Sequence, residues 1–157
     1  MNRKSLVLLA AVGMAVLGVT LFAADANIGT WTLNVATSKF TPGPSPKSQT
    51  LKIEPWGDDG VTYTADGVGP DGKPSRWEFQ AKYDGKDYPF KGNPDADTIA
   101  YKRVDGYTVE ATTKLKGKPS GNVKVVVSKD GKIRTLYQTG KNAAGQDINN
   151  VLVYEKQ

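Results

Sequence analysis

The sequence predicts an all-β fold, an antiparallel up-and-down β-barrel of about 8 to 10 strands formed by residues 27–157. Two observations predict it. Apolar and polar residues alternate along most of this region, and no stretch has a helical period. Asp-Gly and Lys-Gly pairs separate the alternating runs and favour tight hairpin turns, because glycine accepts a positive φ. We expect the first and last runs to pair and close the barrel, which removes exposed sheet edges.

The alternating runs can be followed in order along the chain. Each has one set of residues that faces the interior and one that faces water, as a barrel wall one strand thick requires. The interior sets are Trp31, Leu33 and Val35, then Leu51 and Ile53, then Trp77, Phe79, Ala81 and Tyr83, and then Tyr107, Val109, Ala111, Thr113 and Leu115. The turns are placed at Asp59-Gly60, Asp66-Gly67, Asp71-Gly72, Asp84-Gly85, Asp105-Gly106, Lys116-Gly117, Asp130-Gly131 and Ala144-Gly145.

A proline-rich segment, residues 41–47, interrupts the alternation after the first run. Its prolines fix φ and remove backbone donors, so the segment cannot form the interior of a strand or a helix. We interpret it as an extended crossover loop, and a functional lid is the alternative.

The first residues are typical of an export signal, so we expect residues 1–26 to be a signal peptide and residues 27–157 to form one domain. Positive charge at Asn2-Arg3-Lys4 is followed by an apolar run, and Ala24-Asp25-Ala26 offers a small-x-small cleavage site. The run from Leu6 to Phe22 is short for a membrane-spanning helix, which needs about 20 residues. An uncleaved anchor is the alternative. The predicted location is periplasmic or extracellular.

Composition excludes several kinds of chemistry. The chain has no His and no Cys, and its methionines are Met1 and Met14 of the predicted signal. This excludes disulfides, cysteine nucleophiles, histidine bases, and zinc or copper sites built on imidazole or thiolate. Nucleophile-elbow, phosphate-loop and dinucleotide motifs are missing from the sequence. We expect neither a metal nor another cofactor, and no catalysis; a hydrolase that uses two carboxylates is the remaining enzymatic hypothesis.

Charge bears on possible partners. Lys and Arg outnumber Asp and Glu by 21 to 16, and the basic residues are spread along the chain. This distribution favours a solvated surface, with polyanion binding as the alternative. Nucleic acid is not expected, because no recognised binding motif is present. The membrane is expected as a partner only through an uncleaved signal segment, and the protein is expected to be a monomer.

Aromatic residues supply a candidate ligand wall. Packing of the barrel interior is their default role, and a ligand cavity would use the same residues together with a few polar groups. The candidates for ligand contact are tyrosines and a tryptophan within strands, together with one arginine: Tyr63, Trp77, Tyr101, Arg103, Tyr137 and Tyr154.

Motifs at the two ends of the domain resemble known barrels. Gly29-Thr30-Trp31 is similar to the Gly-x-Trp motif of the lipocalin and calycin barrels. Together with the terminal Val153-Tyr154-Glu155-Lys156, it also resembles the intracellular fatty-acid-binding proteins. The resemblance implies a ten-stranded barrel with a lipid-filled interior. It also implies that Trp31 packs at the closed end under a stacked cation, for which Arg134 is our candidate.

The sequence departs from the fatty-acid-binding proteins in two places. Their arginine two residues before the terminal tyrosine helps to hold the ligand carboxylate, and this position is Leu152 here. Their two-helix lid is replaced by the proline-rich loop. Arg103 or Arg134 would restore a cation for a carboxylate if its side chain faces inward.

These observations lead to two hypotheses about function. The first is an exported, non-catalytic barrel that carries a small apolar or amphipathic molecule, which enters through the open end. The second is an envelope interaction module with a packed interior and a basic surface that binds polyanions. The two differ in whether the interior is hollow.

Overall fold

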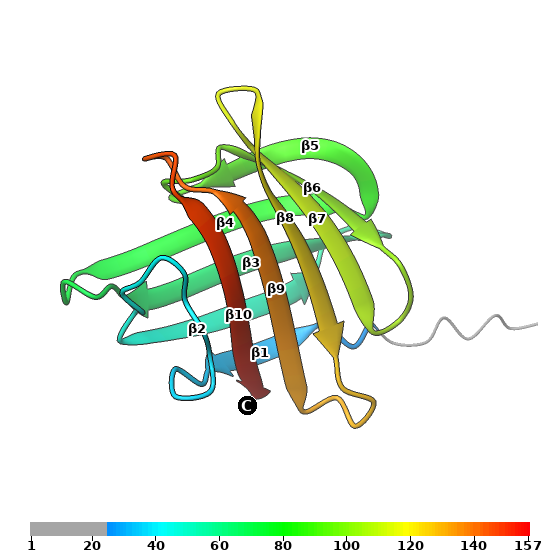
Figure 1. Cartoon of the computed structure of the whole chain (residues 1–157). Coiled ribbons are helices and arrows are strands. Elements are labelled where there is room, and N and C mark those ends of the chain that lie inside the picture. Colours follow the sequence, from blue (N-terminus) through cyan, green and yellow to red (C-terminus); the bar gives the residue numbers. More distant parts are fainter. Residues whose placement is uncertain (1–24) are drawn as a thin grey trace, which may run out of the picture.

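The computed structural model describes residues 25–157, which form ten antiparallel strands closed into one barrel (Figure 1). Strands that follow one another in the chain are hydrogen-bonded neighbours, so the predicted all-β up-and-down barrel is confirmed. Among these residues, no helix is long and apolar enough to cross a membrane. The strands are β1 (Gly29–Leu33), β2 (Ser48–Pro55), β3 (Gly60–Val68), β4 (Pro74–Lys82), β5 (Asp84–Lys91), β6 (Thr98–Arg103), β7 (Thr108–Leu115), β8 (Lys118–Val127), β9 (Ile133–Lys141) and β10 (Asp147–Lys156).

The first and last strands meet, as the sequence predicts. β1 pairs with β10 in an antiparallel register that places Trp31 opposite Lys156 and Leu33 opposite Tyr154. The backbone N–H of Gln157 also donates to the Thr30 carbonyl (3.0 Å). Because β1 pairs with β2 on its other side, closure protects the edges that an open sheet would expose. Residues 1–24, which contain most of the predicted signal peptide, lie outside the described residues.

The segment between β1 and β2 lies against β10. Lys39 and Val151 exchange two backbone hydrogen bonds, of 2.7 and 2.9 Å, and the Val153 N–H donates to Ser38 Oγ (2.9 Å). These bonds continue the pairing of β10 beyond the point where β1 ends. The segment is therefore held on the barrel wall as a crossover.

The barrel wall has its least backbone pairing between β4 and β5. These strands share the pairs Glu78↔Lys91 and Phe79↔Phe90, whereas β3 and β4 pair along the full length of β4. Figure 1 shows β5 bowing away from β4. Backbone pairing therefore joins β4 and β5 only at the end of the hairpin that lies away from its turn.

The turn of the same hairpin differs from the prediction. The sequence placed it at Asp84-Gly85, but β5 already begins at Asp84, which pairs with Lys102 of β6. Tyr83 makes the turn, and the β5–β6 register shifts between Asp84 and Asp87. Gly85 has a positive φ of 73° beside this turn, where glycine is favoured.

A pair of glycines allows β8 and β9 to approach closely. Gly140 is opposite Gly121 and has a φ of 148°. A Cβ at Gly140 would lie 2.1 Å from the Ser120 carbonyl oxygen.

We expect Gly140→Ala to lower the free energy of unfolding by about 1–3 kcal/mol in chemical denaturation, because the backbone must shift. Gly43→Ala is the control, since nothing lies within 4 Å of its added Cβ; equal losses in both variants would contradict this explanation.

Candidate ligand-binding site

The barrel interior contains a narrow cavity of about 70 Å³. Its wall is formed mainly by aromatic and aliphatic side chains, and its polar members are Asn93, Asp95, Thr113, Ser120, Arg134, Gln138 and Lys141. Sites for drug-sized ligands usually have volumes of roughly 300–1,000 Å³. The interior is therefore mostly filled by side chains and keeps a small hollow.

Phe79 of β4 is the centre of the aromatic wall. It stacks on Tyr63, with ring centroids 4.6 Å apart and planes 9° apart. Its centroid lies 5.3 Å from that of Phe90, edge to face, and 5.2 Å from that of Tyr101. Inward positions repeat every two residues along a strand, which is why Trp77 joins Phe79 in this wall. The wall offers broad apolar surface to a ligand.

Arg134 of β9 brings a buried cation to the cavity, with 0% of its surface exposed. Its Nε donates to Asn27 Oδ1 (2.8 Å), and its guanidinium carbon lies 5.5 Å from the centre of the Tyr154 ring. The two Nη atoms are buried and make no hydrogen bond of good geometry within residues 25–157. The Tyr101 hydroxyl is a nearby polar group, and its weak interaction with this guanidinium opposes the rise in the Tyr101 pKa that burial causes. A buried charge that lacks its partner is strongly unfavourable. The site therefore presents two unused donors whose planar geometry suits a carboxylate.

Buried tyrosines surround this cation but do not neutralise it. Burial raises the pKa of Tyr63 and Tyr101, although the nearby Arg134 guanidinium acts in the opposite direction. Burial likewise raises the pKa of Tyr154 to about 12, again opposed by Arg134. The three phenols are neutral at physiological pH. The hydroxyl of Tyr154 donates to Gln49 Oε1 (2.6 Å).

Most of the predicted ligand contacts lie in this wall. Tyr63, Trp77, Tyr101 and Tyr154 all line the cavity. Tyr137 does not, because it lies on the outer face of β9 with 47% of its surface exposed. Arg134 faces inward, and a residue three positions further along a strand faces the opposite way.

Arg103, the other predicted ligand contact, also lies away from the cavity. It is the last residue of β6, where Nη1 donates to Asp59 Oδ1 (2.8 Å) and Nη2 to Asp25 Oδ2 (3.1 Å). Asp25 Oδ2 also accepts a hydrogen bond from the Tyr83 hydroxyl (2.6 Å). Cleavage after Ala26, which stays a prediction, would remove the Asp25 carboxylate from this cluster.

The closed end of the barrel is built around Trp31, which is fully buried and donates from Nε1 to the Asn27 carbonyl (3.0 Å). The sequence interpretation placed Arg134 over this ring, but the cation found there is Lys156, whose Nζ lies 5.1 Å from the ring centroid. The β1–β10 register explains the difference, because it places Lys156 directly opposite Trp31. Arg134 reaches the closed end through Asn27 and lies over Tyr154 instead.

Two polar residues of the interior were missed by sequence reasoning. Gln49 shares the inward face of β2 with Leu51 and Ile53, so the same alternation could have identified it. Asn27 lies before β1 and is only 2% exposed. No sequence pattern marks it, because its importance comes from its position between Trp31 and Arg134.

No protein-family model and no curated protein matches the chain. Solved structures do match. The wild-type fluorescent protein UnaG is 15% identical, with a TM-score of 0.52, over 83% of this chain and 97% of that one. The zebrafish ileal bile acid-binding protein, complexed with cholic acid, is 14% identical, with a TM-score of 0.50, over 84% of this chain and 99% of that one. At these identities the likeness concerns the fold. The protein is a closed, calycin-like barrel, as the motifs at its two ends predicted.

Proposed function

We propose that this protein is an exported, non-catalytic carrier that binds a small amphipathic acid inside its barrel. The acid group pairs with the Arg134 guanidinium, and the apolar part lies along the aromatic wall around Phe79. The observation that carries this proposal is the pair of buried Arg134 Nη atoms, which make no hydrogen bond of good geometry with the described part of the chain.

The charge of the site favours an acid over other ligands. A neutral apolar molecule would leave the Arg134 cation unpaired, and a cationic one would be repelled. A carboxylate offsets the buried charge through two parallel hydrogen bonds. The bile acid-binding protein, which has a similar fold, is complexed with cholic acid, and this supports an organic acid as the ligand. The sequence features of residues 1–26 support export.

The ligand can approach the cavity at the end of the barrel where the β5–β6 and β9–β10 turns lie (Figure 1). There the turn between β5 and β6 supplies Asn93, Asp95 and Ala96 to the cavity lining. Asp95 Oδ1 accepts a hydrogen bond from the Ala143 N–H (2.8 Å), which holds this turn against the β9–β10 turn. An opening between these two turns would admit a ligand without a break in the strands.

A comparison of dodecanoate with dodecanol, followed by calorimetric or fluorescence titration, tests the proposed function. We expect the protein to bind the acid at least tenfold more tightly than the alcohol, because a charged hydrogen-bonded pair contributes about 1.5–3 kcal/mol. Arg134→Met should abolish this preference.

The matched control for this test is Arg76→Met. Arg76 is an outer arginine that pairs with Asp66, with 58% of its side chain exposed, so its loss should leave the preference intact. Equal affinities for acid and alcohol in the unmodified protein, or an acid preference that survives Arg134→Met, would contradict the proposed function.

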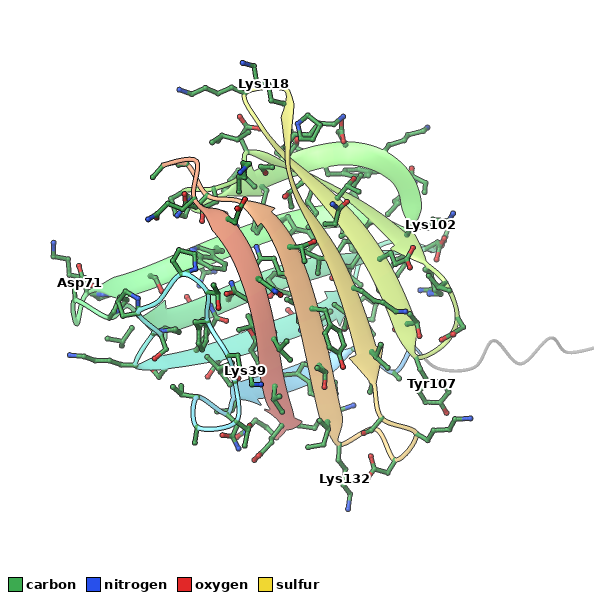
Figure 2. All side chains as sticks on the ribbon, viewed as in Figure 1. Lys39, Asp71, Lys102, Tyr107, Lys118 and Lys132 are labelled. Atoms are coloured by element: carbon green, nitrogen blue, oxygen red, sulfur yellow. The ribbon has the colours of Figure 1, made fainter. Side chains whose placement is uncertain are left out.

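The polyanion hypothesis has less support from the described residues. Lys102, Lys118 and Lys132 point away from the barrel at three separate places (Figure 2), and Lys114 and Lys141 form ion pairs with carboxylates. These lysines do not gather into one basic face. Salt-sensitive retention on an anionic polymer, unchanged by Arg134→Met, would favour this hypothesis over the first.

A further inference from the structure

A second hollow lies on the outside of the barrel, where β5 bows away from β4. This groove has a volume of about 470 Å³, several times that of the interior cavity. Its floor is the outer face of β3 and β4, with Thr62, Thr64 and Gln80. Its apolar side includes Trp56 and Tyr88, whose rings meet edge to face with centroids 6.4 Å apart.

One residue borders both the groove and the interior cavity. Phe79 lines both hollows, and it is the only residue of residues 25–157 that borders the two. On the inner side it contacts Tyr63 and Tyr101, which lie in the cavity wall with Arg134. A continuous row of packed side chains therefore links the buried guanidinium, through the tyrosines and Phe79, to the groove.

Backbone pairing between β4 and β5 stops at Phe79. β4 and β5 pair at Glu78↔Lys91 and Phe79↔Phe90, and no pairing continues from there toward the Tyr83 turn. Phe79 belongs to the pair that lies nearer the turn. To join the groove to the cavity, the Phe79 ring would have to leave its contacts with Tyr63, Phe90 and Tyr101.

The two hollows also complement each other chemically. The interior offers a buried cation and aromatic rings in a volume too small for a long molecule. The groove offers further aromatic surface, then hydroxyl and amide groups, and carries Glu78 and Lys91 at its rim. An amphipathic molecule whose body is apolar and whose far end tolerates water fits the two hollows together.

We propose that the ligand is an elongated amphipathic acid that passes between β4 and β5, with its acid group at Arg134 and its far end in the groove beside Trp56 and Tyr88. This inference rests on the proposed function and adds to it the length of the ligand and the site of its far end. Phe79 then sets whether a ligand can extend beyond the interior.

Filling the groove from outside tests this inference. Gln80→Trp introduces a large side chain on the outer face of β4, away from the interior. We expect it to weaken binding of dodecanoate at least tenfold and to change binding of hexanoate less than twofold, since the shorter acid ends before the groove. Both affinities can be measured by NMR titration. Thr64→Trp, on the neighbouring strand of the groove floor, should give the same result.

Thr50→Trp is the matched control, because Thr50 is an exposed outer residue of β2 that lines none of the described hollows; it should affect neither acid. Unchanged dodecanoate binding in Gln80→Trp and Thr64→Trp overturns this inference and leaves the proposed function standing. Equal weakening of both acids also overturns it, since the substitution then acts on the barrel. If the unmodified protein binds neither acid, the proposed function itself fails.

Discussion

Replacing Trp31 with alanine should lower the free energy of unfolding by about 3–5 kcal/mol, the usual cost of removing a large aromatic side chain from a core. Trp31 has 0% of its surface exposed. The substitution removes its packing at the closed end and its hydrogen bond to the Asn27 carbonyl. It also removes the ring beneath the Lys156 ammonium at the pair that closes the barrel.

Urea denaturation followed by circular dichroism measures this loss. Tyr137→Ala is a suitable control, because this ring lies on the outer face and should change stability by less than about 1 kcal/mol. A loss of similar size in both variants would show that the Trp31 side chain does not hold the closed end together.

The second large effect is expected in alkaline solution. In the unfolded chain tyrosines release their protons near pH 10. In the folded protein burial raises the pKa of Tyr63 and Tyr101, and that of Tyr154 to about 12. Above pH 10 the folded state therefore binds more protons than the unfolded state, so stability falls as pH rises. Each such tyrosine contributes about 1.4 kcal/mol per pH unit in this window and no pH dependence well below it.

This effect can be followed by recording tyrosinate absorbance and circular dichroism at increasing pH. The buried tyrosines should ionise together with the loss of β-structure. Tyr154→Phe should reduce the slope of stability against pH by about 1.4 kcal/mol per pH unit between pH 10 and 12. It should also lower stability near neutral pH by about 1–3 kcal/mol, because Gln49 loses its partner. Ionisation of all tyrosines while the barrel stays folded would contradict this prediction.

The barrel and most of its inward wall could be predicted from the sequence. A two-residue alternation assigns each side chain to a face, so it places Trp31, Leu51 and Phe79 inside, where all three are buried. The motifs at the two ends anticipated closure, because paired end strands protect both edges. These features depend on neighbouring residues along one strand, which is information that the sequence holds directly.

The candidate site was predicted less completely. Counting from Arg134 would have assigned Tyr137 to the outer face of β9, so that error was avoidable. The position of Arg103 could not be predicted by alternation, which assigns it to the same face as Tyr101. Arg103 is the last residue of its strand, and its side chain pairs with Asp25 and Asp59. Such contacts depend on segments that are distant in sequence.

The sequence alone therefore determined the all-β class, the closed barrel and the inward aromatic set, because alternation and turn chemistry are local. Only the tertiary structure decided that Lys156 rather than Arg134 covers Trp31, that the Arg134 Nη atoms are buried without a hydrogen bond of good geometry among residues 25–157, and that β4 and β5 part beside Phe79. Each of these depends on the register between strands and on the space that side chains leave, and neither quantity is encoded in a single stretch of the chain.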